Sequence, residues 1–281
     1  MRQLLCLFFS LVVGANAALA QETAPKRYDC YRTTGRIVVD GKLNEVAWRK
    51  APATELFVDI EGDAKPRPRF QTRAKMLWDD EYFYISAELQ EPHVWGTLTK
   101  RDSVIFHDND FEVFIDPNGD RNEYYELEIN ALNTVWDLFL PKPYRDGGSA
   151  QNSWDITGLK TAVQIQGTLN QSSDTDKGWT VELALPWKVL GEFAHQAAPP
   201  ADGDQWRVNF SRVEWQHEIA DGKYRISLRY QLADDHAHLD RRAQEMRVPF
   251  AIGRGGERAR ILAGARQLLE RRTDAGLGEA A

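Results

Sequence analysis

Carboxylates alternate with large apolar residues in the segment 107–130. Glu112 lies in its first half, and Glu126 and Glu128 lie beyond a turn signal at 117–120. Because successive side chains of a strand point to opposite faces, this alternation predicts a hairpin that collects its acidic groups on one face. Like charges directly across a strand pair destabilise it. The acidic face therefore requires a partner, and three kinds of partner fit.

The first partner is a metal ion. Asp116, Asn118, Asp120 and Asn122 alternate along the turn, and clustered carboxylate and amide oxygens are the ligands that Ca²⁺ takes. The spacing resembles part of an EF-hand loop, but Leu127 stands where that loop has its bidentate Glu. The pattern therefore predicts either a structural calcium site or a solvated turn. No organic cofactor is expected.

The second partner is a set of basic side chains, and the third is a bound sugar. Arg73 and Lys75 share one face of a predicted strand and would neutralise the acidic row if that strand lay beside it. Sugar hydroxyls can bond to carboxylate and guanidinium groups together. The two alternatives are compatible, because a lattice of acids and bases on a sheet face can also hold a carbohydrate.

Strand signals dominate the chain from residue 36 to 225. Short apolar or alternating runs are separated by turn residues, which is typical of an all-β, antiparallel sandwich or jelly-roll-like fold. We expect one domain over residues 21–225, with a short helix at 43–48. The expected strands are 36–41, two within 73–89, 110–116, 124–130, 161–169, 178–187 and 206–215.

The first twenty residues have the character of a secretory signal peptide. A basic start precedes an apolar run that is short for a membrane span, and Ala18-Leu19-Ala20 provides a small-residue cleavage site before Gln21. We therefore expect a secreted or periplasmic protein without a membrane span. Cleavage would leave Cys30 as its single cysteine, which excludes an internal disulfide and leaves stability to the core. We expect a monomer.

Charge and composition argue against one class of partner, nucleic acid, and are compatible with another, carbohydrate. The 281 residues carry a formal net charge of −7, which argues against nucleic acid as a partner because phosphates demand basic surfaces. The chain contains nine Trp, nine Tyr and twelve Phe. Most of these rings are needed for the core, and any that remain exposed are suited to gripping sugar rings.

Residue usage changes near the end of the chain. No lysine follows Lys223 and no tryptophan follows Trp215, whereas arginine becomes frequent in residues 226–281. Within this tail, the segment 256–272 has the spacing of an amphipathic helix. We interpret the tail as atypical, and a reading-frame shift near residue 224 would explain it. A sandwich that lost its native ending in this way would lack one strand and expose an edge.

Two other functions remain open. A glycoside hydrolase needs two carboxylates at a defined separation, and Glu112, Glu126 and Glu128 could supply them, although any acidic strand pair offers such distances. No serine triad, phosphate loop or zinc spacing occurs, so no catalytic residue is assigned.

The second alternative is haem binding. Met76 on a predicted strand, with His93 and His107 downstream, could provide axial ligands. His236 and His238 have ligand-like spacing but lie in the atypical tail. The three methionines of the whole chain make axial ligation by methionine a weak prediction.

Several segments together resemble the family 9 carbohydrate-binding modules and their secreted relatives. "IVVDGKLNEVAW" resembles the opening signature of that family, with Asn44 where Asp is commoner. Later blocks follow in the same order over about residues 28–225: "AKMLWDDEYFYISAEL", "DNDFEVFIDPNGDRNEYYELEINALNT", "GWTVELALPW" and "WRVNFSRVEW".

The resemblance implies a secreted, non-catalytic domain that binds oligo- or polysaccharide and takes part in polysaccharide catabolism. It implies an antiparallel sandwich with structural calcium and a sugar held between two aromatic rings. The first ring corresponds to Phe106, and the second should come from a Trp-containing loop that this sequence lacks. The remaining positions carried over, or placed on the same acidic face, are Glu112, Arg73, Lys75, Glu128 and Asn130; an Arg of the sugar-binding members falls near Glu128.

Overall fold

The computed structural model describes residues 27–33, 35–59, 64–201, 203–226 and 246–253. Twelve strands dominate these residues, and the helices are single turns. The strands are β1 (Tyr28–Arg32), β2 (Thr72–Trp78), β3 (Tyr82–Gln90), β4 (Asp110–Asp116), β5 (Tyr124–Asn130), β6 (Val135–Leu140), β7 (Lys160–Gln166), β8 (Gly178–Pro186), β9 (Gln205–Ser211), β10 (His217–Ala220), β11 (Lys223–Ile226) and β12 (Met246–Gly253). The short helices are α1 (Val46–Lys50), η2 (Ile105–His107), η3 (Tyr144–Asp146) and α2 (Trp187–Leu190).

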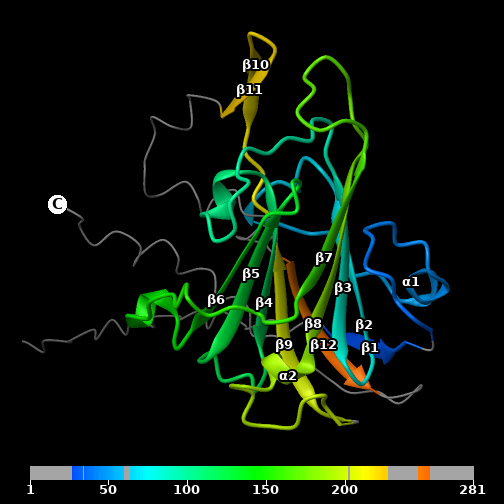
Figure 1. Cartoon of the computed structure of the whole chain (residues 1–281), viewed down its shortest axis with the longest axis vertical. Helices are drawn as coiled ribbons and strands as arrows, with labels where there is room; N and C mark the ends of the chain where they lie inside the picture. The colour runs from blue at the N-terminus through cyan, green and yellow to red at the C-terminus, as the bar shows by residue number, and fades with distance from the viewer. Residues whose placement is uncertain (1–26, 34, 60–63, 202, 227–245, 254–281) are drawn as a thin grey trace, which may run out of the picture.

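Ten of these strands form one continuous sheet in the order β6-β5-β4-β9-β12-β1-β2-β3-β8-β7, and β10 and β11 form a separate hairpin. The sheet bends back on itself, so that β4, β5 and β6 lie on one side of the molecule and β2, β3 and β7 on the other (Figure 1). The predicted all-β, mainly antiparallel sandwich is confirmed. The exceptions are the two pairings of β1, which are parallel.

The core lies between the two layers. It collects alternate residues from both, including Phe111 and Val113 of β4 and Met76 of β2. Trp187 of α2 contacts Phe83 on one layer and Trp206 on the other, with ring centroids 5.5 and 5.3 Å apart. This core fixes the remaining residues of each strand on the two outer faces of the sandwich, which are the surfaces available for function.

Three predicted hairpins are present. β2 pairs with β3, β4 with β5 and β7 with β8, all antiparallel. The predicted short helix is α1. Two expectations about strands are wrong. The segment 36–41 forms no strand, and the sandwich does not lack a strand at its end, because β12 lies between β9 and β1.

Residues 35–51 form a flap over the outer face of the layer that contains β8. The side chain of Glu182 anchors it: one carboxylate oxygen accepts the indole N–H of Trp48 at 2.7 Å, and the other accepts the amides of Asp40 and Gly41 at 3.0 Å each. Gly41 has φ +81°, and a Cβ atom there would lie 2.9 Å from the backbone of Gln164. Only glycine allows this close approach without strain.

The predicted signal peptide, the two tail histidines and the predicted helix at 256–272 lie outside the described residues. Cys30 is buried as a free thiol, and burial raises its pKa well above the ordinary value. None of the helices in the described ranges has the length and apolar character needed to cross a membrane.

Candidate functional site

The predicted acidic row exists, and it lies on the outer face of the β4–β5 layer. Phe111 and Val113 of β4 point into the core, so Glu112 points outward, and Glu128 of β5 stands directly opposite it. Asp110 is the next outward residue on β4. Oxygen atoms of these three carboxylates all lie within 4.8 Å of one another, and all three side chains are fully buried. We call them the acid cluster.

The acid cluster is electrostatically costly. Burial, followed by the charges of Glu112 and Asp110, raises the pKa of Glu128 well above its ordinary value. Donors to the cluster include the amide of Phe106 to Glu128 at 3.1 Å, the hydroxyl of Ser211 to Glu112, and the amide of Val213 to Asp110 at 3.0 Å. A protonated carboxyl in such a cluster can donate a hydrogen bond as well as accept one.

Aromatic rings adjoin the cluster. The ring of Phe106 lies 6.1 Å from that of Trp136 and 5.0 Å from that of His107. Trp136 is the cross-strand neighbour of Glu128. Tyr144 packs against the apolar cluster of the same outer face, and burial, then Tyr124 and the two glutamates, raises its pKa. Half-buried rings beside carboxylates are a combination suited to sugars, which have apolar ring faces and hydroxyl edges.

Arg73 and Lys75 do not belong to this site, and the expectation that they neutralise the acidic row is wrong. Alternate β2 residues enter the core, which leaves Arg73 and Lys75 on the outer face of the opposite layer. Arg73 approaches Glu88 of β3 at 3.9 Å, and the ammonium of Lys75 donates to the carbonyl of Trp48 at 2.9 Å. The strand order separates β2 from β4, although both show the same alternation in the sequence.

Asn130 lies at the correct end of β5 but has a structural role. Its amide nitrogen donates to the carbonyl of Leu98 at 2.8 Å and to Asp108 at 2.9 Å, and its oxygen accepts the amides of Leu132 and Thr134. These four bonds leave little capacity for a ligand, so Asn130 shapes the loop beside the site.

Trp215, a residue that the sequence analysis did not assign, braces the ring of Phe106. Its indole N–H donates to the carbonyl of Phe106 at 2.8 Å, while Glu128 accepts the amide of the same residue. The backbone amide of Trp215 in turn donates to Asn109 at 2.8 Å. The three-residue turn η2 has no side-chain cap, so these outside bonds hold Phe106 in place.

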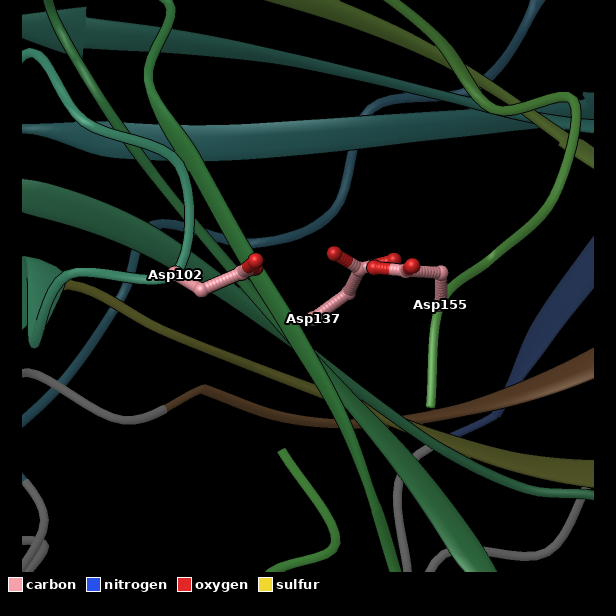
Figure 2. Close-up of side chains that lie close together, drawn as sticks. All are labelled: Asp102, Asp137 and Asp155. Atoms are coloured by element: carbon pink, nitrogen blue, oxygen red, sulfur yellow. The ribbon is translucent and has the colours of Figure 1, made fainter. Parts of the chain in front are cut away.

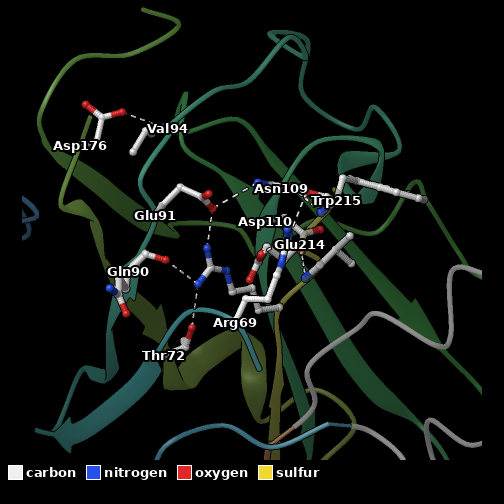
Figure 3. A network of polar contacts seen from close by, with 12 residues as sticks. Arg69, Thr72, Gln90, Glu91, Val94, Asn109, Asp110, Asp176, Glu214 and Trp215 are labelled. Carbon is white, nitrogen blue, oxygen red and sulfur yellow. Dashed lines mark hydrogen bonds and ion pairs between the residues drawn. The ribbon is translucent and has the colours of Figure 1, made fainter. Parts of the chain in front are cut away.

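A buried polar network continues from Asn109 to the opposite layer (Figure 3). Asn109 donates to Glu91 at 3.1 Å, and Glu91 forms an ion pair with Arg212, whose side chain is fully buried. Arg212 also donates to the hydroxyl of Thr72 at 3.0 Å and to the carbonyl of Gln90 at 2.9 Å. Burial raises the pKa of Glu91 to about 7, despite the opposing effect of Arg212. The network ties the η2 turn to β2 and β3.

The predicted calcium residues form a self-bonded turn. Asp116 accepts the amides of Gly119 and Arg121 at 2.8 and 2.9 Å, and burial raises its pKa to about 6. Asn118 and Asp120 accept amides two residues ahead, the second from Asn122. The geometry accounts for the residue types without an ion, and the calcium site stays a prediction.

A second acidic group gathers at the start of β6, where Asp102, Asp137 and Asp155 point toward one another (Figure 2). The guanidinium of Arg101 lies among them and pairs with Asp137 and Asp155. Asp137 also accepts the amide of Ile156 at 2.6 Å. A bound cation is therefore unnecessary to explain this group.

The geometry does not favour the two alternative functions. Glu112, Glu126 and Glu128 are buried, so none is open to an attacking water as it stands. The three candidate haem ligands lie in different environments: Met76 is in the core, His93 bonds to Tyr224 of β11, and His107 is exposed beside Phe106.

Sequence comparison identifies the domain type. Residues 39–204 match the model of the family described as "Carbohydrate family 9 binding domain-like". A curated relative, exoglucanase XynX of Acetivibrio thermocellus, is 28% identical over 156 residues, which are 56% of this chain and 12% of the relative. Endo-1,4-beta-xylanase C of Paenibacillus barcinonensis is 32% identical over 152 residues, covering 54% of this chain and 12% of the relative. The match thus spans about one eighth of these longer proteins.

Solved structures that match part of the chain include a family 9 carbohydrate-binding module from Caldicellulosiruptor kristjanssonii in complex with cellotriose. Its TM-score is 0.45 at 16% identity, over 70% of this chain and 80% of that one. A putative carbohydrate-binding protein from Bacteroides uniformis has a TM-score of 0.48 at 15% identity, over 72% and 88% of the two chains. Because the family model covers more than half of the sequence, the chain belongs to the carbohydrate family 9 binding domain-like family.

Proposed function

We propose that this protein binds oligo- or polysaccharide at the outer face of the β4–β5 layer. The observation that carries the proposal is the half-buried ring pair of Phe106 and Trp136 directly beside the acid cluster. The apolar faces of sugar rings can pack on the two aromatic rings, while the buried carboxylate of Glu128 holds the backbone of Phe106 in position. Family membership supports the proposal, since curated relatives with this domain are named as an exoglucanase and xylanases.

The proposal assigns no catalytic step to the chain. A binding domain needs a preorganised surface, and the bonds from Trp215 and Glu128 to the backbone of Phe106 supply it. Export by the predicted signal peptide would place this surface where polysaccharide degradation takes place outside the cytoplasm.

The test is Phe106→Ala in the full chain, measured by calorimetry with cellohexaose and xylohexaose. We expect at least a tenfold weaker affinity at the β4–β5 face, because one ring of the pair is lost. Phe193→Ala is the matched control, since this half-buried ring packs on Phe139 beyond α2 and is remote from the acid cluster. Equal affinities in wild type and Phe106→Ala would refute the site.

A further inference from the structure

A groove with unused polar groups lies on the other outer face of the sandwich, far from the acid cluster in the fold. It runs between the flap and the outer residues of β3, β7 and β8, and its volume is about 790 Å³. Tyr82 and Tyr84 form its floor, and Arg36, Glu81 and Lys160 lie around it. A cavity of a few hundred to a thousand Å³ is the usual size of a small-molecule site.

The two tyrosines are held in place. Their ring centroids are 5.8 Å apart, and the hydroxyl of Tyr84 donates to Asp79 at 2.8 Å. The other oxygen of Asp79 accepts the amides of Glu81 and Tyr82 at 2.8 Å each. Trp187 secures the same turn, because its indole N–H donates to the carbonyl of Asp79 at 2.8 Å. The floor of the groove is therefore ordered before any ligand arrives.

The opposite wall is ordered as well. The flap is fixed to β8 by the three bonds to the buried carboxylate of Glu182. Thr180 adds a hydroxyl bond to the carbonyl of Gly41 at 2.6 Å. Binding of a ligand in the groove therefore loses little free energy to the ordering of either wall.

The charged groups at the rim are free to interact. Arg36, Glu81 and Lys160 form no ion pair with any residue in the described part of the chain. Lys160 places its ammonium 4.2 Å from the ring centroid of Tyr82. An exposed contact of this kind is worth only about 0.5–1 kcal/mol, so a ligand ring can displace the ammonium and still accept a hydrogen bond from it.

This mixture of groups points to one chemical class. A phosphate or polyanion would need cations without the carboxylates of Asp79 and Glu81 nearby, and a lipid chain would need an apolar lining. An uncharged polyhydroxyl ligand uses donors, acceptors and aromatic faces together, because each hydroxyl both donates and accepts. The rim offers donors at Arg36 and Lys160 and an acceptor at Glu81.

We propose that this groove is a second binding site for an uncharged glycan, on the face opposite the acid cluster. The proposal goes beyond the function assigned to the β4–β5 face and does not depend on it. Two sites on opposite faces would let one molecule bind two polysaccharide chains, or one chain more tightly through the effective concentration of the second site.

The test compares wild type, Phe106→Ala, Tyr82→Ala and the double variant by calorimetry with cellohexaose and xylohexaose, with melting temperatures as the check of folding. We expect a stoichiometry of two for wild type, one for each single variant, and loss of binding in the double variant. Lys160→Ala serves as a second groove variant if Tyr82→Ala does not fold, and it should weaken the same site at least threefold.

The outcomes separate the two sites. Loss of all binding in Phe106→Ala, with Tyr82→Ala and Lys160→Ala unchanged, overturns the groove and leaves the β4–β5 site standing. Loss of all binding in the groove variants, with Phe106→Ala unchanged, supports the groove and overturns the β4–β5 site. Wild-type protein that binds neither sugar overturns both.

Discussion

The two outer faces of the sandwich bury glutamates in opposite ways. On the β8 face, Glu182 stands alone and receives three donors, the indole of Trp48 and two flap amides. On the β4–β5 face, Glu112 and Glu128 stand directly opposite each other, with Asp110 beside them. All these side chains are fully buried. Burial raises the pKa of both Glu182 and Glu128. The neighbouring charges of Glu112 and Asp110 raise the pKa of Glu128 further, whereas the hydrogen bonds to Glu182 lower its pKa.

We interpret this as the difference between a structural carboxylate and the carboxylates of the proposed binding site. Glu182 stabilises the fold because fixed donors replace the water that it loses. In the acid cluster, oxygen atoms of three carboxylates lie within 4.8 Å of one another in a region of low dielectric, so ionising all three at once is unfavourable. Proteins retain such unfavourable groups at functional sites, which agrees with the rings that adjoin the cluster.

Replacing glutamate by the isosteric glutamine should change the stability of the fold in opposite directions on the two faces. Glu182→Gln places an amide NH₂ against N–H donors and should destabilise the fold by about 3 kcal/mol. Glu128→Gln removes one negative charge from the cluster and can still accept the amide of Phe106, so it should stabilise the fold by about 1 kcal/mol at pH 8. Urea unfolding of the two variants measures both values.

A loss of stability in Glu128→Gln as large as that in Glu182→Gln would contradict the comparison. It would mean that the carboxylate of Glu128 is an anchor of the same kind.

Glu91, in the buried polar network between the two layers, should make the stability of the fold depend on pH. The folded protein holds a proton on Glu91 up to about pH 7, whereas the unfolded chain releases it near the ordinary value of 4.5. Between these values the folded state binds more protons, so stability falls as pH rises. We expect a loss on the order of 2–3 kcal/mol between pH 5 and 8, to which the raised pKa of Glu128 adds in the same direction.

Urea unfolding at several pH values, with Glu91→Gln as the comparison, measures this effect. The variant lacks the titrating group and should show a smaller slope of stability against pH. An equal slope in both proteins would show that Glu91 does not titrate in this range.

The smallest expected effect concerns the brace of Phe106. Trp215→Phe keeps the ring and removes the indole N–H, so the η2 turn loosens and oligosaccharide affinity should fall about fivefold, or roughly 1 kcal/mol. Trp154→Phe is the matched control, because it removes an indole bond to Glu192 at 3.1 Å in another part of the fold.

A double variant tests whether Trp215 acts through Phe106. In a Phe106→Ala background, Trp215→Phe should cause no further loss of affinity, since the ring that it positions is absent. Additive losses would instead give Trp215 its own contact with the sugar.

Local patterns in the sequence predicted much of the fold. Alternation and the turn at Asn118 and Gly119 predicted the β4–β5 hairpin and placed Glu112 and Glu128 on one face, as observed. Long-range pairing was beyond such patterns. Residues 36–41 carry a β-branched apolar run followed by a turn signal, as a strand would. The amides of Asp40 and Gly41 instead bond to Glu182, 142 positions from Asp40, and no local pattern predicts that partner.

The site was predicted in part for the same reason. Phe106 and Glu128 come together as expected. Arg73 and Lys75 were misplaced because β2 and β4 show the same alternation, and only the order of strands in the sheet assigns them to different layers. Trp136 could have been found, since it alternates with core residues in β6 beside the acidic strand.

The position of β12 has a consequence for how the chain reaches its native state. β1 pairs in parallel with β12, so Tyr28 and Phe250 become neighbours although they come from opposite ends of the described sequence. Such high contact order slows folding, because the chain loses the entropy of closing a long loop before the strand pairing stabilises it. Until residues 246–253 pair with them, the facing edges of β1 and β9 are unpaired, and unpaired strand edges are the groups through which folding chains aggregate.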